Sequence, residues 1–132
     1  MTPVVNYTSL IVFENINTMS KPKRIREHLS NFNIAGFGYY EGSIVFSELK
    51  IGTELELLPE PYNKYDSDAI AIYFQDTKLG FMPRDENRMI AKLLKLGFTN
   101  FEVRVQKIDP TEDPEAQVRV ILFAYKLVDN SN

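Results

Sequence analysis

The sequence predicts a mainly β protein with some helix, built as a small OB-like or SH3-like six-stranded barrel with one main helix and a short second helix. Short apolar stretches recur along the chain, and several alternate apolar and polar side chains as half-buried strands do. Only residues 83–96 carry a long helical pattern. The 132 residues, 44% hydrophobic and 25% charged, are most simply one globular domain.

The first 30 residues are interpreted as an N-terminal extension (1–30) that precedes the domain predicted over 31–132. The extension is compatible with an edge strand, an arm or a short helix. Within it, Lys21–His28 is expected to be helical after Pro22, with its basic side chains in solvent.

Three elements follow in the first half of the domain. Asn33–Tyr40 contains two glycines and is expected to be a strand with a bulge or a close backbone approach. Ser43–Leu49 is expected to form one or two helical turns capped by Ser43. Thr53–Leu58 alternates leucine with glutamate, which predicts a half-buried strand.

The centre of the chain predicts a hairpin and then the main helix. Ile70–Phe74 is apolar on both faces and is expected to be a central strand, and Leu79–Met82 returns after a turn. Pro83–Leu96 has Pro in the first turn, acidic residues at its start and lysines at its end. The apolar stripe of this helix is expected in the core: Met89, Ile90, Leu93 and Leu94.

Two alternating strands close the domain. In Phe101–Ile108, we expect Phe101, Val103 and Val105 to point inward and Glu102, Arg104 and Gln106 outward. An acidic loop leads to the last strand, Gln117–Tyr125.

Several chemistries are excluded by composition. The chain has no cysteine, so it has no disulfide, thiolate nucleophile or cysteine zinc site. His28 is the only histidine, which excludes a histidine metal cluster and a Ser-His-Asp triad. Glu41 stands where a dinucleotide-binding G-x-G-x-x-G would need its third glycine. We therefore expect no cofactor, no metal and no enzymatic activity.

Charge and hydropathy restrict the partners. Residues 1–30 carry +2, so residues 31–132 carry −5 of the net −3. Such an acidic body argues against broad, non-specific coating of nucleic acid but not against a short local site. The apolar run Leu10–Phe13 is too short for a signal peptide or a membrane span, so a cytoplasmic protein is expected.

Three motifs then occur in a definite order: Gly36–Gly42 (GFGYYEG), Glu60–Tyr73 (EPYNKYDSDAIAIY) and Lys78–Asn87 (KLGFMPRDEN). Together they resemble the HIRAN domain family, over roughly residues 32–127, in its stand-alone bacterial form. The resemblance implies an OB-like barrel that binds single-stranded DNA at a free 3′ end. In eukaryotes the family's domain stands at the front of helicase-like DNA-repair ATPases.

The resemblance also implies a set of nucleic-acid-binding residues: Tyr39, Tyr40, Asn63, Tyr65, Asp66, Phe81 and Arg84. The tyrosine pair would contact the terminal nucleotides, and Arg84 would face phosphate. Asn63, Tyr65 and Asp66 would surround the terminal sugar and base. Phe81 would lie beside or under the pocket. Gly38 departs from the family, whose eukaryotic pattern has an arginine there, and Lys64 replaces the proline of N-P-Y-D.

Asp66 is the residue whose chemistry discriminates among ligands. An ionised carboxylate only accepts hydrogen bonds, so a terminal 3′-hydroxyl suits it and a 3′-phosphate does not. The structural alternative is that Asp66 and Asp68 cap the turn into the next strand. For Arg84, a salt bridge to Asp85 or Glu60 is the alternative. Tyr39 and Tyr40, as neighbours on a strand, are expected to point to opposite faces, one of them structural.

The sequence thus predicts a non-enzymatic module for the 3′-hydroxyl end of single-stranded DNA, in DNA repair or processing. The alternative is a protein-interaction module that recruits a helicase-like or other DNA-processing ATPase and has a degenerate DNA pocket. A metal-dependent nuclease is disfavoured, because Asp66, Asp68 and Asp76 do not match a metal-binding loop.

Overall fold

The computed structural model describes residues 22–129, and residues 1–21 and 130–132, with most of the predicted extension, lie outside the described residues. The chain divides into two compact units. The larger is Glu27–Ala124, and the described part of the smaller is residues 22–26 and 125–129. Within the smaller unit, the Arg24 guanidinium lies 4.1 Å from the ring centroid of Tyr125.

Six strands form one sheet, which confirms the mainly β class. They are β1 (Lys23–Asn33), β2 (Glu54–Pro59), β3 (Ile70–Phe74), β4 (Thr77–Phe81), β5 (Phe101–Ile108) and β6 (Val118–Val128). The order is β1-β6-β5-β2-β3-β4, and the neighbours from β6 to β4 pair antiparallel. As predicted, β3 lies between two other strands.

Among residues 22–129, a single isolated bridge joins the edges of this sheet, so the sheet is not closed and the barrel is approximate. Just after β1, Ala35 forms an isolated bridge with Phe81 of β4 through two backbone hydrogen bonds of 2.8 Å. Gly80 permits this approach, because a Cβ there would lie 2.3 Å from the Ala35 carbonyl oxygen.

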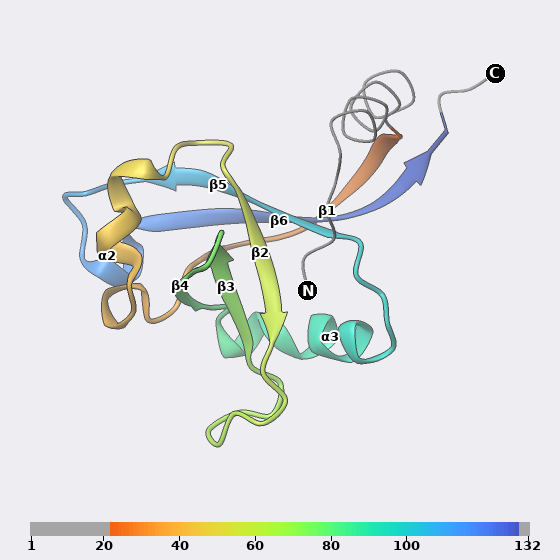
Figure 1. Cartoon of the computed structure of the whole chain (residues 1–132), viewed down its shortest axis with the longest axis horizontal. Helices are drawn as coiled ribbons and strands as arrows, with labels where there is room; N and C mark the ends of the chain where they lie inside the picture. The colour runs from red at the N-terminus through yellow and green to blue at the C-terminus, as the bar shows by residue number, and fades with distance from the viewer. Residues whose placement is uncertain (1–21, 130–132) are drawn as a thin grey trace, which may run out of the picture. The chain divides into compact units, whose positions relative to one another are not determined.

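The core lies between the sheet and the main helix. Strand residues that alternate along the sequence are buried, among them Leu55, Ile70, Ile72, Leu79, Val103, Val105, Val118, Val120 and Leu122. The helix α3 (Arg84–Lys95) adds Ile90 and Ala91 to the same cluster. In Figure 1, α3 crosses the end of the sheet from which the β2–β3 loop emerges.

The helices agree with the prediction in place but differ in detail. The short second helix is α2 (Gly42–Val45), continued by the 3-10 turn η2 (Phe46–Glu48). Ser43 does not cap α2, since Glu41 holds the N-cap position without a side-chain bond. In α3, Pro83 is the N-cap, and Met89 is 66% exposed rather than in the core.

The helix expected over Lys21–His28 is wrong, because β1 occupies Lys23–Asn33. Lysine, arginine and glutamate favour helix as isolated residues, but hydrogen bonding to β6 decides the conformation here. The strand runs across the position between residues 30 and 31, where the sequence places the start of the domain. That domain boundary stays a prediction.

One residue predicted to point outward is buried. Glu102 on β5 is only 2% exposed, and its carboxylate accepts a hydrogen bond of 2.8 Å from the Arg104 Nε. A buried carboxylate requires such a donor, and Arg104 supplies it from two residues along the strand. Beyond Arg104, the pairing of β5 with β6 shifts register between Val105 and Lys107.

Candidate functional site

The β2–β3 loop is shaped by the side chain of Asn63. Its Oδ1 accepts hydrogen bonds from the backbone N–H groups of Tyr65 (2.9 Å) and Asp66 (3.2 Å). Its Nδ2 donates to Glu60 at 3.1 Å. This Asx-type arrangement fixes the loop without bulk, which is why an asparagine suits the position.

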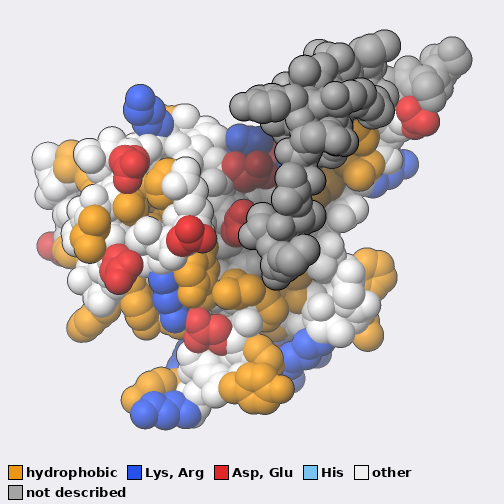
Figure 2. Space-filling model, in the orientation of Figure 1, with side chains coloured by type: hydrophobic (Ala, Val, Ile, Leu, Met, Phe, Trp, Pro, Cys, Tyr) orange, Lys and Arg blue, Asp and Glu red, His pale blue; other side chains and the backbone are white. Residues whose placement is uncertain are grey.

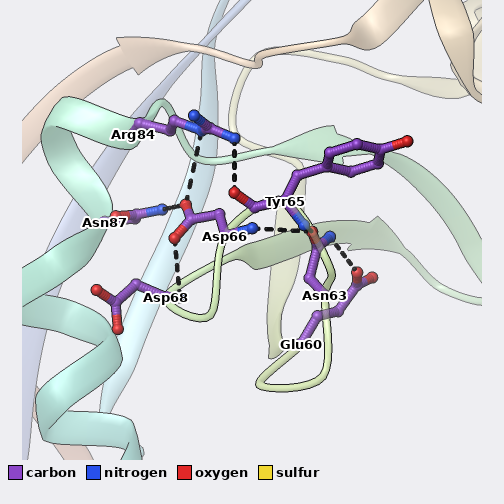
Figure 3. Close-up of polar contacts among 7 residues, drawn as sticks. All are labelled: Glu60, Asn63, Tyr65, Asp66, Asp68, Arg84 and Asn87. Atoms are coloured by element: carbon purple, nitrogen blue, oxygen red, sulfur yellow. Dashed lines mark hydrogen bonds and ion pairs between the residues drawn. The ribbon is translucent and has the colours of Figure 1, made fainter.

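Asp66 is held from three sides (Figure 3). Its Oδ1 accepts the backbone N–H of Asp68 at 2.9 Å. Its Oδ2 accepts the Asn87 side-chain N–H, also at 2.9 Å, and lies 3.9 Å from the Arg84 Nε. Asp66 therefore caps the turn into β3, as the structural alternative predicts. It also lines the pocket described below.

These contacts lower the pKa of Asp66 from its ordinary value. The hydrogen bond from Asn87 is the largest cause, followed by the one from the Asp68 backbone, and Arg84 and Lys95 add attraction. Partial burial opposes them. At neutral pH the group is a carboxylate with only acceptor chemistry.

Arg84 does not pair with Asp85 or Glu60, the partners that the sequence suggested. Its Nη2 donates to the Tyr65 carbonyl oxygen at 3.0 Å, and its charge faces Asp66. Glu60 is bound instead by Lys78 at 2.7 Å. Burial raises the pKa of Glu60, but the hydrogen bonds from Lys78 and Asn63 outweigh it and leave that pKa lowered.

The tyrosine pair does not lie on a strand, so the predicted strand is wrong here and its alternation does not set the directions of the two rings. After Ala35, Gly36 turns the chain in the left-handed region (φ 72°), and Phe37–Tyr39 form the 3-10 turn η1. Tyr39 is 87% exposed, while Tyr40 packs edge-to-face on Phe81 with ring centroids 5.5 Å apart. A buried Phe37 anchors the turn.

All seven predicted site residues line one pocket of about 260 Å³. The pocket also includes five residues that the sequence analysis did not single out: Ala35, Gly36, Ala69, Met82 and Asn87. Its deep part is apolar, since Ala69 and Met82 are buried. Arg84 and Tyr65 stand at the exposed side, with the Tyr65 ring turned away from α3 (Figure 3).

Asn87 is the most informative of the missed residues. It is 3% exposed and shares the buried face of α3 with Ile90, Ala91 and Leu94, at helical spacing. A polar residue in an apolar stripe is the signal that would have found it, because a buried amide needs partners.

Gly38, where the family pattern has an arginine, is crowded. A Cβ at this position would lie 2.8 Å from the Cβ of Pro114, the first residue of the 3-10 turn η3 (Pro114–Ala116). Because η1 packs closely against η3 at this point, position 38 has no room for a side chain such as the family's arginine.

Other kinds of site are not seen in the described part of the chain. Over residues 22–129, no group of three or more His, Cys, Asp or Glu side chains could hold a metal ion. No helix in that same range is long and apolar enough to cross a membrane.

A small sheet with an open pocket lined by exposed aromatic rings, a carboxylate and an arginine defines a ligand-binding module. The HIRAN domain family model matches residues 28–122, and the chain belongs to that family. HIRAN domains are DNA-binding modules that are not catalytic by themselves, and family membership supports a DNA-binding module here.

Two solved structures share the fold. A protein from Lactobacillus plantarum is 23% identical, with a TM-score of 0.68, and the match covers 79% of this chain and 99% of that one. The HIRAN domain of human HLTF is 15% identical, with a TM-score of 0.55, and the match covers 80% of this chain and 78% of that one. No curated protein matches the chain.

Proposed function

We propose that this protein binds single-stranded DNA at a free 3′-hydroxyl end, as a non-enzymatic module in DNA repair or processing. The observation that carries the proposal is the convergence of the seven residues on one pocket, with aromatic rings beside an ionised carboxylate. Bases stack on such rings for about 1–3 kcal/mol each.

Asp66 supplies the specificity for the hydroxyl. Two carboxylate oxygens offer about four acceptor positions, and two of them receive the N–H groups of Asp68 and Asn87. The remaining capacity suits a donor such as a 3′-hydroxyl. A 3′-phosphate brings negative charge to the same place and is repelled.

The test is fluorescence anisotropy at low salt with two oligonucleotides that differ only in a 3′-hydroxyl or a 3′-phosphate. We expect tighter binding of the hydroxyl end, and equal binding or no binding would refute the proposal. Asp66→Ala should reduce the preference. Asp68→Ala, which removes a neighbouring carboxylate paired with Lys95, is the matched control.

Arg84 is proposed to face a phosphate, and its side chain is largely exposed for that role. Arg84→Ala should reduce the slope of log affinity against log salt by about 0.7, the value for one phosphate contact on a single strand.

The second candidate is a protein-interaction module that recruits a helicase-like or other DNA-processing ATPase. The net charge of −5 over residues 31–132 and the crowded Gly38 favour it. A pull-down that recovers such an ATPase after nuclease treatment would support it, and loss of the partner on treatment would refute it.

The cytoplasmic location stays a prediction.

A further inference from the structure

One flank of α3 carries a row of basic side chains that leads away from the pocket. They are Arg84, Arg88, Lys92 and Lys95, spaced by three or four residues as helix neighbours on one side are. The buried residues Asn87 and Ile90 face the core, and the buried Ala91 lies at the border between that face and the basic row. Arg84, which lines the pocket, stands at one end of the row.

The ends of the row are paired with the β2–β3 loop, but its middle is not. Arg84 faces Asp66 at 3.9 Å, and Lys95 Nζ lies 3.2 Å from the Asp68 carboxylate. The side chains of Arg88 and Lys92 are exposed and have neither a hydrogen bond nor an ion pair with any part of residues 22–129. They are two uncompensated cations beside the candidate site.

Helix stability accounts for only part of this placement: Lys92 and Lys95 lie in the last turn, where the helix dipole favours cations, but the spacing of the like charges is unfavourable. Like charges four residues apart repel, and α3 has this spacing twice, from Arg84 to Arg88 and from Arg88 to Lys92. The row also gathers four of the eleven basic residues in a segment, 31–132, that is acidic overall. On the face drawn in Figure 2, acidic and basic side chains are interspersed.

We propose that Arg88 and Lys92 bind phosphates of the DNA strand that leaves the pocket past Arg84. The inference rests on the proposed function and extends it from the terminal nucleotide to the strand on its 5′ side. Four residues of helix rise about 6 Å. Phosphates of a stacked strand are about 3.4 Å apart along its axis, so a strand along α3 presents phosphates to each cation in turn.

The experiment compares the wild-type chain with Arg88→Gln/Lys92→Gln. Glutamine keeps the helix propensity close to that of the replaced residues, so α3 should be retained. The ligands are a thymidine dinucleotide and a thymidine 12-mer, each with a 3′-hydroxyl or a 3′-phosphate. Anisotropy is measured over a range of salt concentrations. Lys50→Gln/Lys107→Gln, at two exposed positions off α3 and outside the pocket lining, is the charge-matched control.

We expect the α3 variant to keep the affinity for the dinucleotide and the preference for the 3′-hydroxyl. Its slope of log affinity against log salt for the 12-mer should fall by about 1.4, because two single-strand phosphate contacts are lost. The control variant should retain the wild-type slope. Unchanged dinucleotide binding also shows that the variant pocket is folded.

Failure of the two proposals gives different results. If both double variants have the wild-type slope while the hydroxyl preference persists, the phosphate path is overturned and the end-binding function stands. If the wild-type chain shows no hydroxyl preference but the α3 variant alone loses the slope, the path stands and end recognition is overturned. If the wild-type chain binds none of the four ligands, both are overturned.

Discussion

The two oxygens of the Asp66 carboxylate face different parts of the chain. One fixes the β2–β3 loop through the Asp68 N–H, and the other binds Asn87 on α3. The same group is the proposed acceptor for a terminal hydroxyl. The Asp66 carboxylate would thus bind the loop and the ligand at once. Its orientation depends on the uncharged, buried side-chain amide of Asn87.

Asn87→Ala should therefore raise the pKa of Asp66 toward its ordinary value, since the largest cause of the lowered pKa is removed. Two-dimensional NMR titration of the aspartate carboxyl carbons measures this. Asp109 is the internal control, because Thr111 lowers its pKa independently. An unchanged Asp66 titration would contradict the assignment.

The same substitution should change the pH dependence of stability in a definite sense. A lowered folded-state pKa stabilises the fold above the unfolded value, near 3.8, and this stabilisation is lost as pH falls through the folded pKa. In Asn87→Ala, the free energy of unfolding should therefore fall less as the pH is lowered through this range. At neutral pH the variant should lose about 1–3 kcal/mol in urea unfolding, the usual cost of removing a partner from a buried hydrogen bond.

At this scale, sequence reasoning found seven pocket residues because motif order and residue type carry information about them. It did not find their partners. Arg84 pairs across the loop with Asp66 rather than with its sequence neighbour Asp85, because chain folding brings residue 66 to the start of α3. Which residue supplies the counter-charge is a tertiary property.

At the scale of elements, the contact between η1 and η3 determines what position 38 can hold. Restoring the family's arginine by Gly38→Arg should not restore a phosphate contact, because its Cβ would meet the Pro114 ring at 2.8 Å. We expect destabilisation of about 1–3 kcal/mol from overpacking, measured by urea unfolding.

Two further variants test the cause. Ser43→Arg, which adds the same charge at an exposed position of α2, should be nearly neutral. Pro114→Gly combined with Gly38→Arg should cost less than the sum of the single changes, because the clash is removed. Strict additivity would show that the ring is not responsible.

The elements that sequence predicted well are those with strong hydrophobic periodicity. The leucines of β2, the apolar run of β3 and the length of α3 belong to this group. The failures share a different cause. The charged residues of β1 favour helix until β6 pairs with them, and Asn33–Tyr40 has strand-like composition although Gly36 turns the chain.

At the scale of the whole molecule, the mainly β class and the order of elements followed from the sequence, but sheet closure did not. Alternation shows which face of a strand is buried, not which strands become edges. The bridge between Ala35 and Phe81 joins segments that periodicity treats independently. For the same reason, the sequence did not show that Glu102 would be covered.

That bridge has a consequence for the motions of the domain. Ala35 and Phe81 line the pocket, and their two backbone hydrogen bonds are the only ones that join the sheet edges within residues 22–129. A ligand in the pocket would contact Ala35 and Phe81 at once and would hold the two edges of the sheet together. Occupancy and local opening would then be mutually exclusive.

Amide hydrogen exchange would reveal this behaviour. If opening of the edge requires release of the ligand, the Ala35 and Phe81 amides should exchange about 100-fold more slowly at a ligand concentration of 100 Kd. The Val105 amide, bonded to Thr53 at 2.9 Å outside the pocket, should show a smaller change. Equal slowing at all three amides would indicate global stabilisation instead. Binding of DNA would then stabilise the bridge between Ala35 and Phe81, where the two edges of the open sheet meet.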